Sequence, residues 1–189
     1  HPCSPRRTSL ALTASMYRDR RSKRMVAVIN CVLNQNARAP DCAVFPGMNV
    51  QVVDVLNKHG VGIIQMPCPE MTCLDLPRST PEGSSIRDAL DTPKGRECCR
   101  QLSVSVVDQI QEFMENGFKV FAILGGDVGS PGCAVHLSTG DETNQKILEG
   151  SGVFIKELYA ELAKRNIEIP LRGIRDSNTN ELAEDISWI

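Results

Sequence analysis

Short apolar runs of strand character alternate along this chain with segments of helical periodicity. The runs occupy residues 25–30, 61–66 and 118–124, and after each of them apolar residues recur at every third or fourth position. Because parallel strands need a crossover connection, usually a helix, this alternation predicts a parallel sheet covered by helices on both faces. A fourth run at 167–171 contains Pro170, which has no N–H to donate, so we expect that strand at an edge.

Stripes of apolar residues predict three helices. Gly60 ends the first helix, and Asn116-Gly117 ends the second immediately before the third strand. Residues 77–96 are rich in proline, glycine, serine and charge, so they predict a long excursion that forms a flexible cover over the strand ends. A polar loop is predicted at 138–144. The stripes consist of Val52, Val53 and Leu56, of Leu102, Val106, Ile110 and Phe113, and of Phe154, Leu158 and Leu162.

Length and composition favour a single domain. The chain has 189 residues, 41% of them hydrophobic, so we assign residues 25–189 to one α/β domain of the three-layer Rossmann-like or flavodoxin-like type. The formal net charge of −2 gives no signature of nucleic-acid binding. No stretch approaches the roughly 18 to 20 apolar residues that cross a bilayer. We therefore expect a soluble, cytoplasmic protein with no membrane partner.

Residues 1–24 form a basic N-terminal extension with seven lysines and arginines against one acid. The apolar stretch within it is shorter than the roughly 7 to 15 residues of a secretory signal and is followed by more basic residues. We expect a solvated extension, the alternative being an arm that contacts RNA or an acidic partner. The basic residues are Arg6, Arg7, Arg18, Arg20, Arg21, Lys23 and Arg24.

Three cysteines each stand just past one of the first three strands. They are Cys31, Cys68 and Cys133, and the carboxyl ends of parallel strands share one edge of a sheet, where open α/β folds place their ligands. Any one of them alone is as well explained as a small core residue. Together they predict three converging thiolates with a vacant fourth position, a ligand set that suits an iron–sulfur cluster or zinc.

The other cysteines leave alternatives open. Cys42 or Cys73 could supply a fourth ligand, which would make the site structural or electron-transferring rather than catalytic. Cys98 and Cys99 begin the second helix, where packing or an incidental thiol is the expected role. A domain of this size with a good core does not need disulfides, so a reducing compartment is expected. His59 and His136 are expected to be surface or hydrogen-bonded residues.

Four ordered motifs between residues 25 and 136 resemble those of the 2-thiouracil desulfidase family and related desulfidases. They are Cys31-Val-Leu-Asn-Gln-Asn-Ala-Arg38, Cys68-Pro-Glu70, Leu76-Pro-Arg78 and Ile123-Leu-Gly-Gly-Asp-Val-Gly-Ser-Pro-Gly-Cys133. In that family three cysteines hold a [4Fe–4S] cluster whose fourth iron is free to take sulfur from a thiolated base. The resemblance implies that Cys31, Cys68 and Cys133 are the metal ligands.

The resemblance also implies further site residues. Glu70 and Ser130 match the pattern and are the catalytic candidates, for proton handling and substrate positioning, while Arg38 and Asn34 are the substrate-binding candidates. Structural alternatives are a surface carboxylate or helix-end cap for Glu70, a turn cap for Ser130, and a loop-stabilising ion pair for Arg38.

Two departures from the family pattern suggest a side branch. Ala39-Pro40-Asp41 replaces the usual tyrosine, acid and glycine, and Gly132 replaces the serine that usually precedes the third cysteine. The resulting hypothesis is an iron–sulfur-dependent desulfidase that releases hydrogen sulfide from a thiolated nucleobase or a similar small thio-compound. A close variant acts on thiolated tRNA and uses the basic extension for phosphate contacts. The alternative is a non-catalytic iron–sulfur or zinc module for structure or electron transfer.

Overall fold

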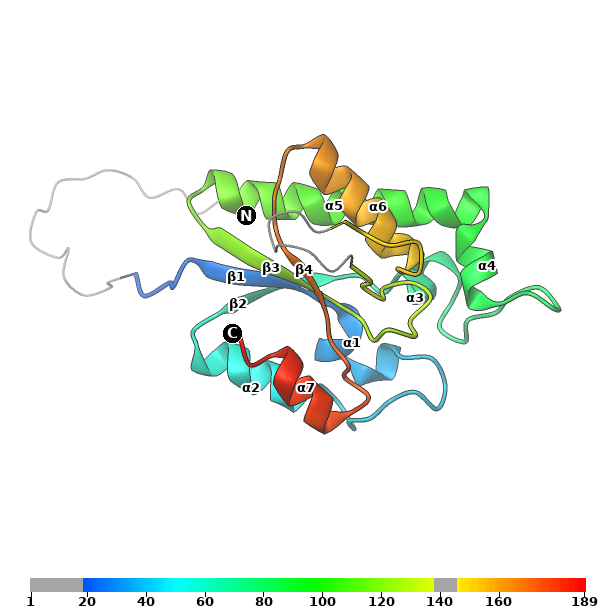
Figure 1. The fold of residues 1–189 in the computed structure, drawn as a ribbon, viewed down its shortest axis with the longest axis horizontal. Coiled ribbons are helices and arrows are strands. Elements are labelled where there is room, and N and C mark those ends of the chain that lie inside the picture. Colours follow the sequence, from blue (N-terminus) through cyan, green and yellow to red (C-terminus); the bar gives the residue numbers. More distant parts are fainter. Residues whose placement is uncertain (1–18, 138–145) are drawn as a thin grey trace, which may run out of the picture.

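The computed structural model describes residues 19–137 and 146–189 and contains a four-stranded parallel sheet (Figure 1). The strands are β1 (Arg24–Ile29), β2 (Gly62–Met66), β3 (Lys119–Gly125) and β4 (Leu171–Gly173), in the order β2-β1-β3-β4. This order is the one of flavodoxin-like sheets, in which the chain changes direction between β1 and β3. The predicted α/β fold is confirmed.

Helices cover both faces of the sheet and produce three layers. Figure 1 shows α5 (Pro93–Glu115) and α6 (Val153–Lys164) over one face, with α2 (Val50–Lys58) and α7 (Thr179–Asp185) over the other. The shorter elements gather near the carboxyl ends of the strands. They are α1 (Asn30–Leu33), η1 (Gln35–Ala37), α3 (Pro69–Cys73) and α4 (Ile86–Asp91).

The central strand β1 is buried on both faces, as expected for a parallel sheet. Val26, Ala27 and Val28 have no exposed surface, and β1 pairs in register with β2 from Met25↔Gly62 to Ile29↔Met66. The predicted helical stripes face this strand layer. Their buried members are Val52, Leu56, Val106, Ile110, Phe154, Leu158 and Leu162.

The prediction of a flexible excursion over 77–96 is wrong for its second half. Residues 86–91 form α4, whose first turn is closed by a capping box between Ser85 and Asp88. Helix α5 then begins at Pro93, where Thr92 caps the Gly95 N–H and proline suits the first helical position. The starts of α4 and α5 are therefore determined by the cap residues Ser85 and Thr92, which a search for apolar periodicity does not detect.

The fourth strand is shorter and later than predicted, at Leu171–Gly173 instead of 167–171. Its edge position is confirmed, and Pro170 immediately before it contributes only its carbonyl, which accepts from Ile123 N–H at 2.9 Å. Helices α1 and α7 were not predicted. The predicted loop at 138–144 and residues 1–18 of the basic extension lie outside the described residues. In the described part of the chain, no helix has the length and apolar character to span a membrane.

Candidate functional site

Three strand ends bring the three predicted ligand cysteines to one place. Cys31 lies in the first turn of α1 directly after β1, Cys68 caps α3 two residues after β2, and Cys133 follows the glycine-rich loop after β3. All three line a cavity of about 500 Å³. Cys42 lines the same cavity with a free, exposed thiol.

Burial raises the pKa of all three thiols. It raises the pKa of Cys31 to about 11, helped by the charge of Asp176 and opposed by the nearby Arg38 guanidinium. Burial likewise raises the pKa of Cys68, and it raises that of Cys133 well above the usual value, with a contribution from the charge of Cys31. Thiols that raise one another's pKa are favoured as thiolates only when positive charge joins them, as in a metal or cluster site.

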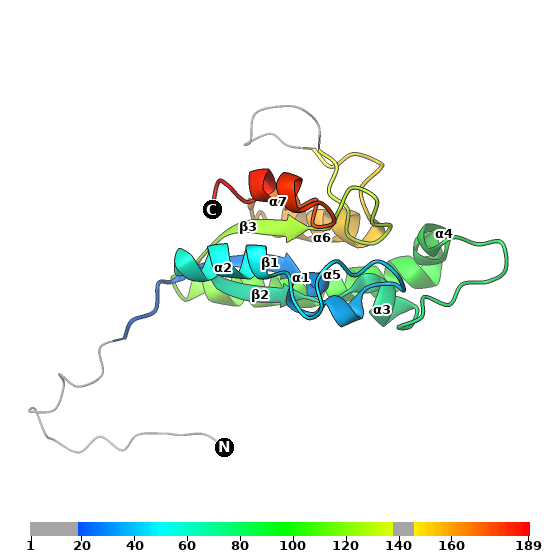
Figure 2. The ribbon, with the colours of Figure 1, turned by 90° about the horizontal axis from the view of Figure 1, so that it is seen from below.

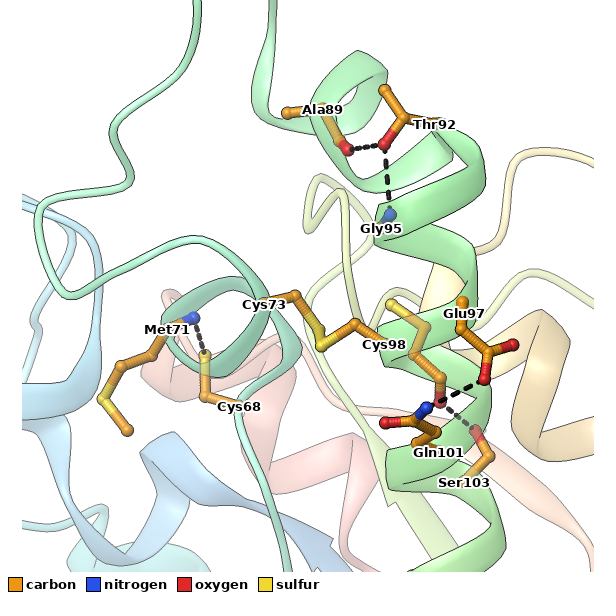
Figure 3. Close-up of a disulfide and its surroundings, with 11 residues drawn as sticks. Cys68, Met71, Cys73, Ala89, Thr92, Gly95, Glu97, Cys98, Gln101 and Ser103 are labelled. Carbon is orange, nitrogen blue, oxygen red and sulfur yellow. Dashed lines mark hydrogen bonds between the residues drawn. A yellow bond between two sulfur atoms is a disulfide. The ribbon is translucent and has the colours of Figure 1, made fainter.

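The surroundings of the sulfur atoms fit cluster ligands. Cys68 Sγ accepts from Met71 N–H at 3.5 Å (Figure 3) and from Arg78 Nη2 at 3.4 Å. Cys133 Sγ lies 3.0 Å from Ser130 Oγ. A Cβ at Gly126 would lie only 2.6 Å from Cys133 Sγ, so glycine is needed where the backbone passes that sulfur. Hydrogen bonds to ligand sulfur of this kind stabilise its negative charge and tune a bound cluster.

Glu70 connects the second and third cysteine segments. Its Oε1 accepts from Ser130 Oγ and from Gly132 N–H, each at 3.3 Å, and its Oε2 lies 3.5 Å from Arg78 Nε. The residue is only 8% exposed, so the surface-carboxylate alternative is wrong. A Cβ at Gly132 would lie 2.7 Å from Pro69 Cγ. The serine that usually stands at this position in the family would therefore collide with Pro69 unless the proline shifted.

Arg38 lies at the end of η1 and is held in place by two acceptors. Its Nη2 donates to Asp176 Oδ2 at 2.5 Å, and its Nη1 donates to the Cys42 carbonyl at 2.7 Å. Burial raises the pKa of Asp176, while the charge of Arg38 opposes that rise. Arg38 thus forms the ion pair that was the structural alternative to substrate binding. The same guanidinium also faces the cavity beside Cys31.

Asn34 is not brought to the cavity. Its side chain is exposed and caps η1, with Oδ1 accepting from Asn36 N–H at 3.1 Å. His59 is exposed and His136 is hydrogen-bonded, as expected for these two histidines. His59 caps the end of α2, and His136 Nε2 lies 2.9 Å from the Val128 carbonyl oxygen.

The suggestion that Cys73 supplies a fourth ligand is wrong, because Cys73 forms a disulfide with Cys98 (Figure 3). The expectation of an incidental thiol at Cys98, and of a chain without disulfides, is wrong for the same reason. The end of α3 packs beside α5 with a Cα–Cα distance of 5.8 Å between the two residues, within bridging range. Cys99 is free and buried, as expected for a packing residue.

Four site residues received no role from the sequence. Arg78 stands in a quoted motif and is nevertheless 6% exposed, with its Nη2 also donating to the Ala37 carbonyl. Asp127 and Ser177 line the cavity, and Asp176 is buried behind Arg38. The signal for Asp176 and Ser177 was their place after the fourth strand, since every strand end in a parallel sheet faces the same edge.

In the described ranges, no group of three or more His, Cys, Asp or Glu side chains has the spacing of a single-ion site. The sulfur donors that remain are the four free thiols that line the cavity, those of Cys31, Cys42, Cys68 and Cys133. Thiolate sulfur is the ligand that iron–sulfur clusters take, with one cysteine per iron in a cubane.

The fold and the site define a three-layer α/β protein with a cysteine-lined cavity at the carboxyl edge of its sheet. The chain is 30% identical over 149 residues to the uncharacterized protein MJ0003 of Methanocaldococcus jannaschii, which covers 79% of this chain and 84% of that protein. It belongs to the same family as that protein. No protein-family model matches the chain, and no solved structure matches it.

Proposed function

We propose that the protein is an iron–sulfur-dependent desulfidase that removes sulfur as hydrogen sulfide from a thiolated nucleobase or a similar small thio-compound. The observation that carries the proposal is the meeting, in one cavity, of three cysteines from three strand ends with the Glu70–Ser130 pair. The resemblance of the motifs to desulfidases supplies the reaction, which is replacement of a thiocarbonyl sulfur by oxygen from water, with hydrogen sulfide as the second product.

Cys31, Cys68 and Cys133 would hold the [4Fe–4S] cluster. Three cysteines leave one iron of a cubane without a protein ligand, and when bound such a cluster supplies a sulfur-seeking Lewis acid at the cavity. The hydrogen bonds from Arg78 and from the Met71 N–H to the Cys68 sulfur stabilise the thiolate form that ligation requires. A location in the cytoplasm is part of this proposal, because ligation needs the three cavity thiols unoxidised. The Cys73–Cys98 disulfide would then be exposed to reduction there, and the proposed chemistry does not use it.

Glu70 and Ser130 form a short proton path in the cavity. Ser130 Oγ lies 3.3 Å from Glu70 Oε1 and 3.0 Å from Cys133 Sγ, so the hydroxyl spans the distance between the carboxyl group and the ligand sulfur. Glu70 takes a proton from the attacking water and passes it to Ser130, while the Ser130 hydroxyl gives its own proton toward the departing sulfur, so that both groups end as they began. The backbone N–H of Gly132 and the Arg78 guanidinium fix the carboxyl group for this task.

The cavity favours a small molecule over thiolated tRNA as substrate. Its volume of about 500 Å³ suits a single heterocycle. The basic residues next to β1 lie at the opposite, amino end of the sheet (Figure 2), where Arg21 and Lys23 contact the Phe118 ring at 5.7 and 5.9 Å. Phosphate contacts made there would be remote from the cysteines.

Cys42 is the observation that favours the non-catalytic alternative, because its thiol lines the same cavity. A fourth cysteine ligand would close the cluster and leave a structural or electron-transfer centre. The two functions are separated by purifying the protein and its Cys42→Ala variant without oxygen. The desulfidase proposal expects about four irons, four sulfides and absorbance near about 400 nm in both proteins.

The same preparations are then supplied with 2-thiouracil, and hydrogen sulfide and uracil are measured together. Equal amounts of the two products, released by both proteins, support the proposal. Loss of the cluster in Cys42→Ala, or an intact cluster that releases no sulfide from thio-compounds, contradicts it.

A further inference from the structure

Asp127 is a carboxylate of the cavity to which the proposed function gives no role. It follows Gly126, whose backbone passes close to the Cys133 sulfur, and it lines the cavity with the three cysteines. The Asp127 side chain therefore lies just past the end of β3, in the cavity that the proposed function makes the substrate site.

The contacts of Asp127, which is half-buried, differ from those of the buried carboxylates Asp176 and Glu70. Asp176 is paired with Arg38 and Glu70 with Arg78, so each of these two cavity arginines already has its own acid. Asp127 instead accepts from two neutral donors, the Ser177 hydroxyl on Oδ2 and the Gly129 N–H on Oδ1 at 3.5 Å. A carboxylate offers about four acceptor positions. Asp127 is thus oriented by its neighbours and still has acceptor capacity beside the cavity.

A donor stands close to this acceptor. Asp127 accepts from Ser177, the residue directly after Asp176, and the Asp176 carboxylate accepts from Arg38. Arg38 also lines the cavity, and its five N–H groups outnumber its three acceptors, which are Asp176, the Cys42 carbonyl and the Cys31 sulfur. The segment after β3 and the end of η1 therefore present an acceptor and a donor to the same cavity. A heterocycle in which N–H and carbonyl groups alternate has the complementary pattern.

We propose that Asp127 accepts a hydrogen bond from a ring N–H of the substrate and so restricts the enzyme to cyclic thioamides with a free N–H beside the thiocarbonyl carbon. Ser177 is a positioning residue, which holds the carboxylate in the orientation that the ring requires. Arg38 takes a carbonyl oxygen of the same ring. This inference rests on the proposed function for the identity of the site, and it adds the class of substrate.

The test compares ligands that differ only at nitrogen. Uracil, 1-methyluracil and 3-methyluracil are titrated calorimetrically into anaerobically purified protein, and the matching 2-thiouracils are assayed for sulfide release. In the wild type, methylation of the contacted nitrogen is expected to lower affinity and kcat/KM by about 10- to 100-fold, the usual weight of a hydrogen bond to a charged group.

The Asp127→Asn variant separates the hydrogen bond from the bulk of the methyl group. The affinity of this variant for the N–H compound should fall by about 10-fold, while its affinity for the N-methyl compound changes by no more than about 2-fold. The preference for the N–H compound, which is the ratio of these two affinities, should therefore decrease. Ser177→Ala should reduce the ratio of the affinities for the N–H and N-methyl compounds by about 2- to 5-fold, because the Asp127 carboxylate would be less ordered. Asp41→Asn is the matched control, because Asp41 also lines the cavity and its φ of 61° is tolerated by asparagine. The control should keep the full preference.

The outcomes distinguish this inference from the function on which it rests. An unchanged N–H preference in Asp127→Asn, with cluster absorbance and thermal unfolding as in the wild type, overturns the role of Asp127 even if sulfide is released. Selective uracil binding that depends on Asp127 without sulfide release from any thio-compound supports the binding role and overturns the desulfidase function. Absence of both binding and turnover overturns the two together.

Discussion

Cys68 and Cys73 stand at the two ends of α3, and their sulfur atoms have different surroundings. Cys68 caps the start of the helix, where its sulfur accepts from Met71 N–H and from Arg78 and lines the cavity. Cys73 stands at the end of the same helix, where its sulfur is bonded to Cys98 on α5 (Figure 3). One short element thus separates a site cysteine from a structural one.

The difference teaches that the position of a cysteine relative to a strand end is more informative than its distance from another cysteine. At about 100° per residue, five residues of helix turn a side chain by about 140° net, so the two sulfurs point to different sides of α3. Cys31 and Cys133 are far from Cys68 in sequence, yet they share its cavity because all three follow parallel strands. The cavity cysteines and the disulfide cysteines should therefore differ in function as they differ in position.

The largest effect, loss of the cluster, is expected when serine replaces one of the cavity cysteines Cys31, Cys68 and Cys133. Cys31→Ser, Cys68→Ser and Cys133→Ser should each abolish the absorbance near about 400 nm and the iron content of anaerobic protein, because a hydroxyl is a poor substitute for a thiolate ligand. Cys98→Ser, on the other side of α3, should retain the cluster. Full iron content in any of the three cavity variants would remove that residue from the ligand set.

The next effect concerns the carboxyl group that joins the two cysteine segments. Glu70→Gln should keep the cluster and bind substrate, yet turn over about 10²- to 10⁴-fold more slowly, the usual contribution of general acid–base catalysis. Ser130→Ala should lose less, because water can replace a hydroxyl in the proton path. Sulfide release is measured under anaerobic conditions. A turnover number for Glu70→Gln equal to that of the wild type would leave Glu70 as a structural link between Ser130, Gly132 and Arg78.

The structural cysteines should affect stability instead of chemistry. Cys73→Ser or Cys98→Ser opens a loop of 25 residues, for which loop entropy predicts a loss of about 3 kcal/mol in the free energy of unfolding. Denaturant unfolding of the oxidised and reduced wild type gives the same comparison without a substitution. Cys42→Ser, which removes an exposed free thiol, is the control and should leave stability within about 0.5 kcal/mol. Simultaneous loss of stability and of iron would show that the disulfide also holds Cys68 in place.

The sequence predicts much of this fold because the deciding patterns are local. Val26, Ala27 and Val28 in a strand buried on both faces, and the four-residue spacing of Phe154, Leu158 and Leu162, are each visible within one element. The convergence of the three cysteines needs only one further step, the common edge of parallel strands. The same rule applied to β4 would have found Asp176 and Ser177, but the fourth strand was placed a few residues too early.

The parts that the sequence did not predict depend on contacts between distant segments. Arg78 has φ of 61° and reaches Glu70, Cys68 and the Ala37 carbonyl, which no periodicity indicates. The bond between Cys73 and Cys98 depends on how α3 packs against α5. Asn34, which stands in the first quoted motif, was predicted to bind the substrate. Helix α1 and the turn into η1 instead leave its side chain exposed.

The smallest effect on turnover and substrate affinity is therefore expected from substitution of Asn34. This variant tests whether the binding site ends before Asn34. Asn34→Ala removes the cap of a single 3-10 turn, so the free energy of unfolding should fall by about 0.5 to 1 kcal/mol. Turnover and the affinity for uracil should stay within about 2-fold of the wild type, because the side chain does not line the cavity.

Arg38→Gln is the paired variant from the other end of the same turn, where the side chain does face the cavity and pairs with Asp176. It should weaken substrate binding by at least about 10-fold, since a charged donor is lost and Asp176 is left buried without its cation. Equal losses of affinity in the two variants would place Asn34 in the binding site and extend the cavity past η1.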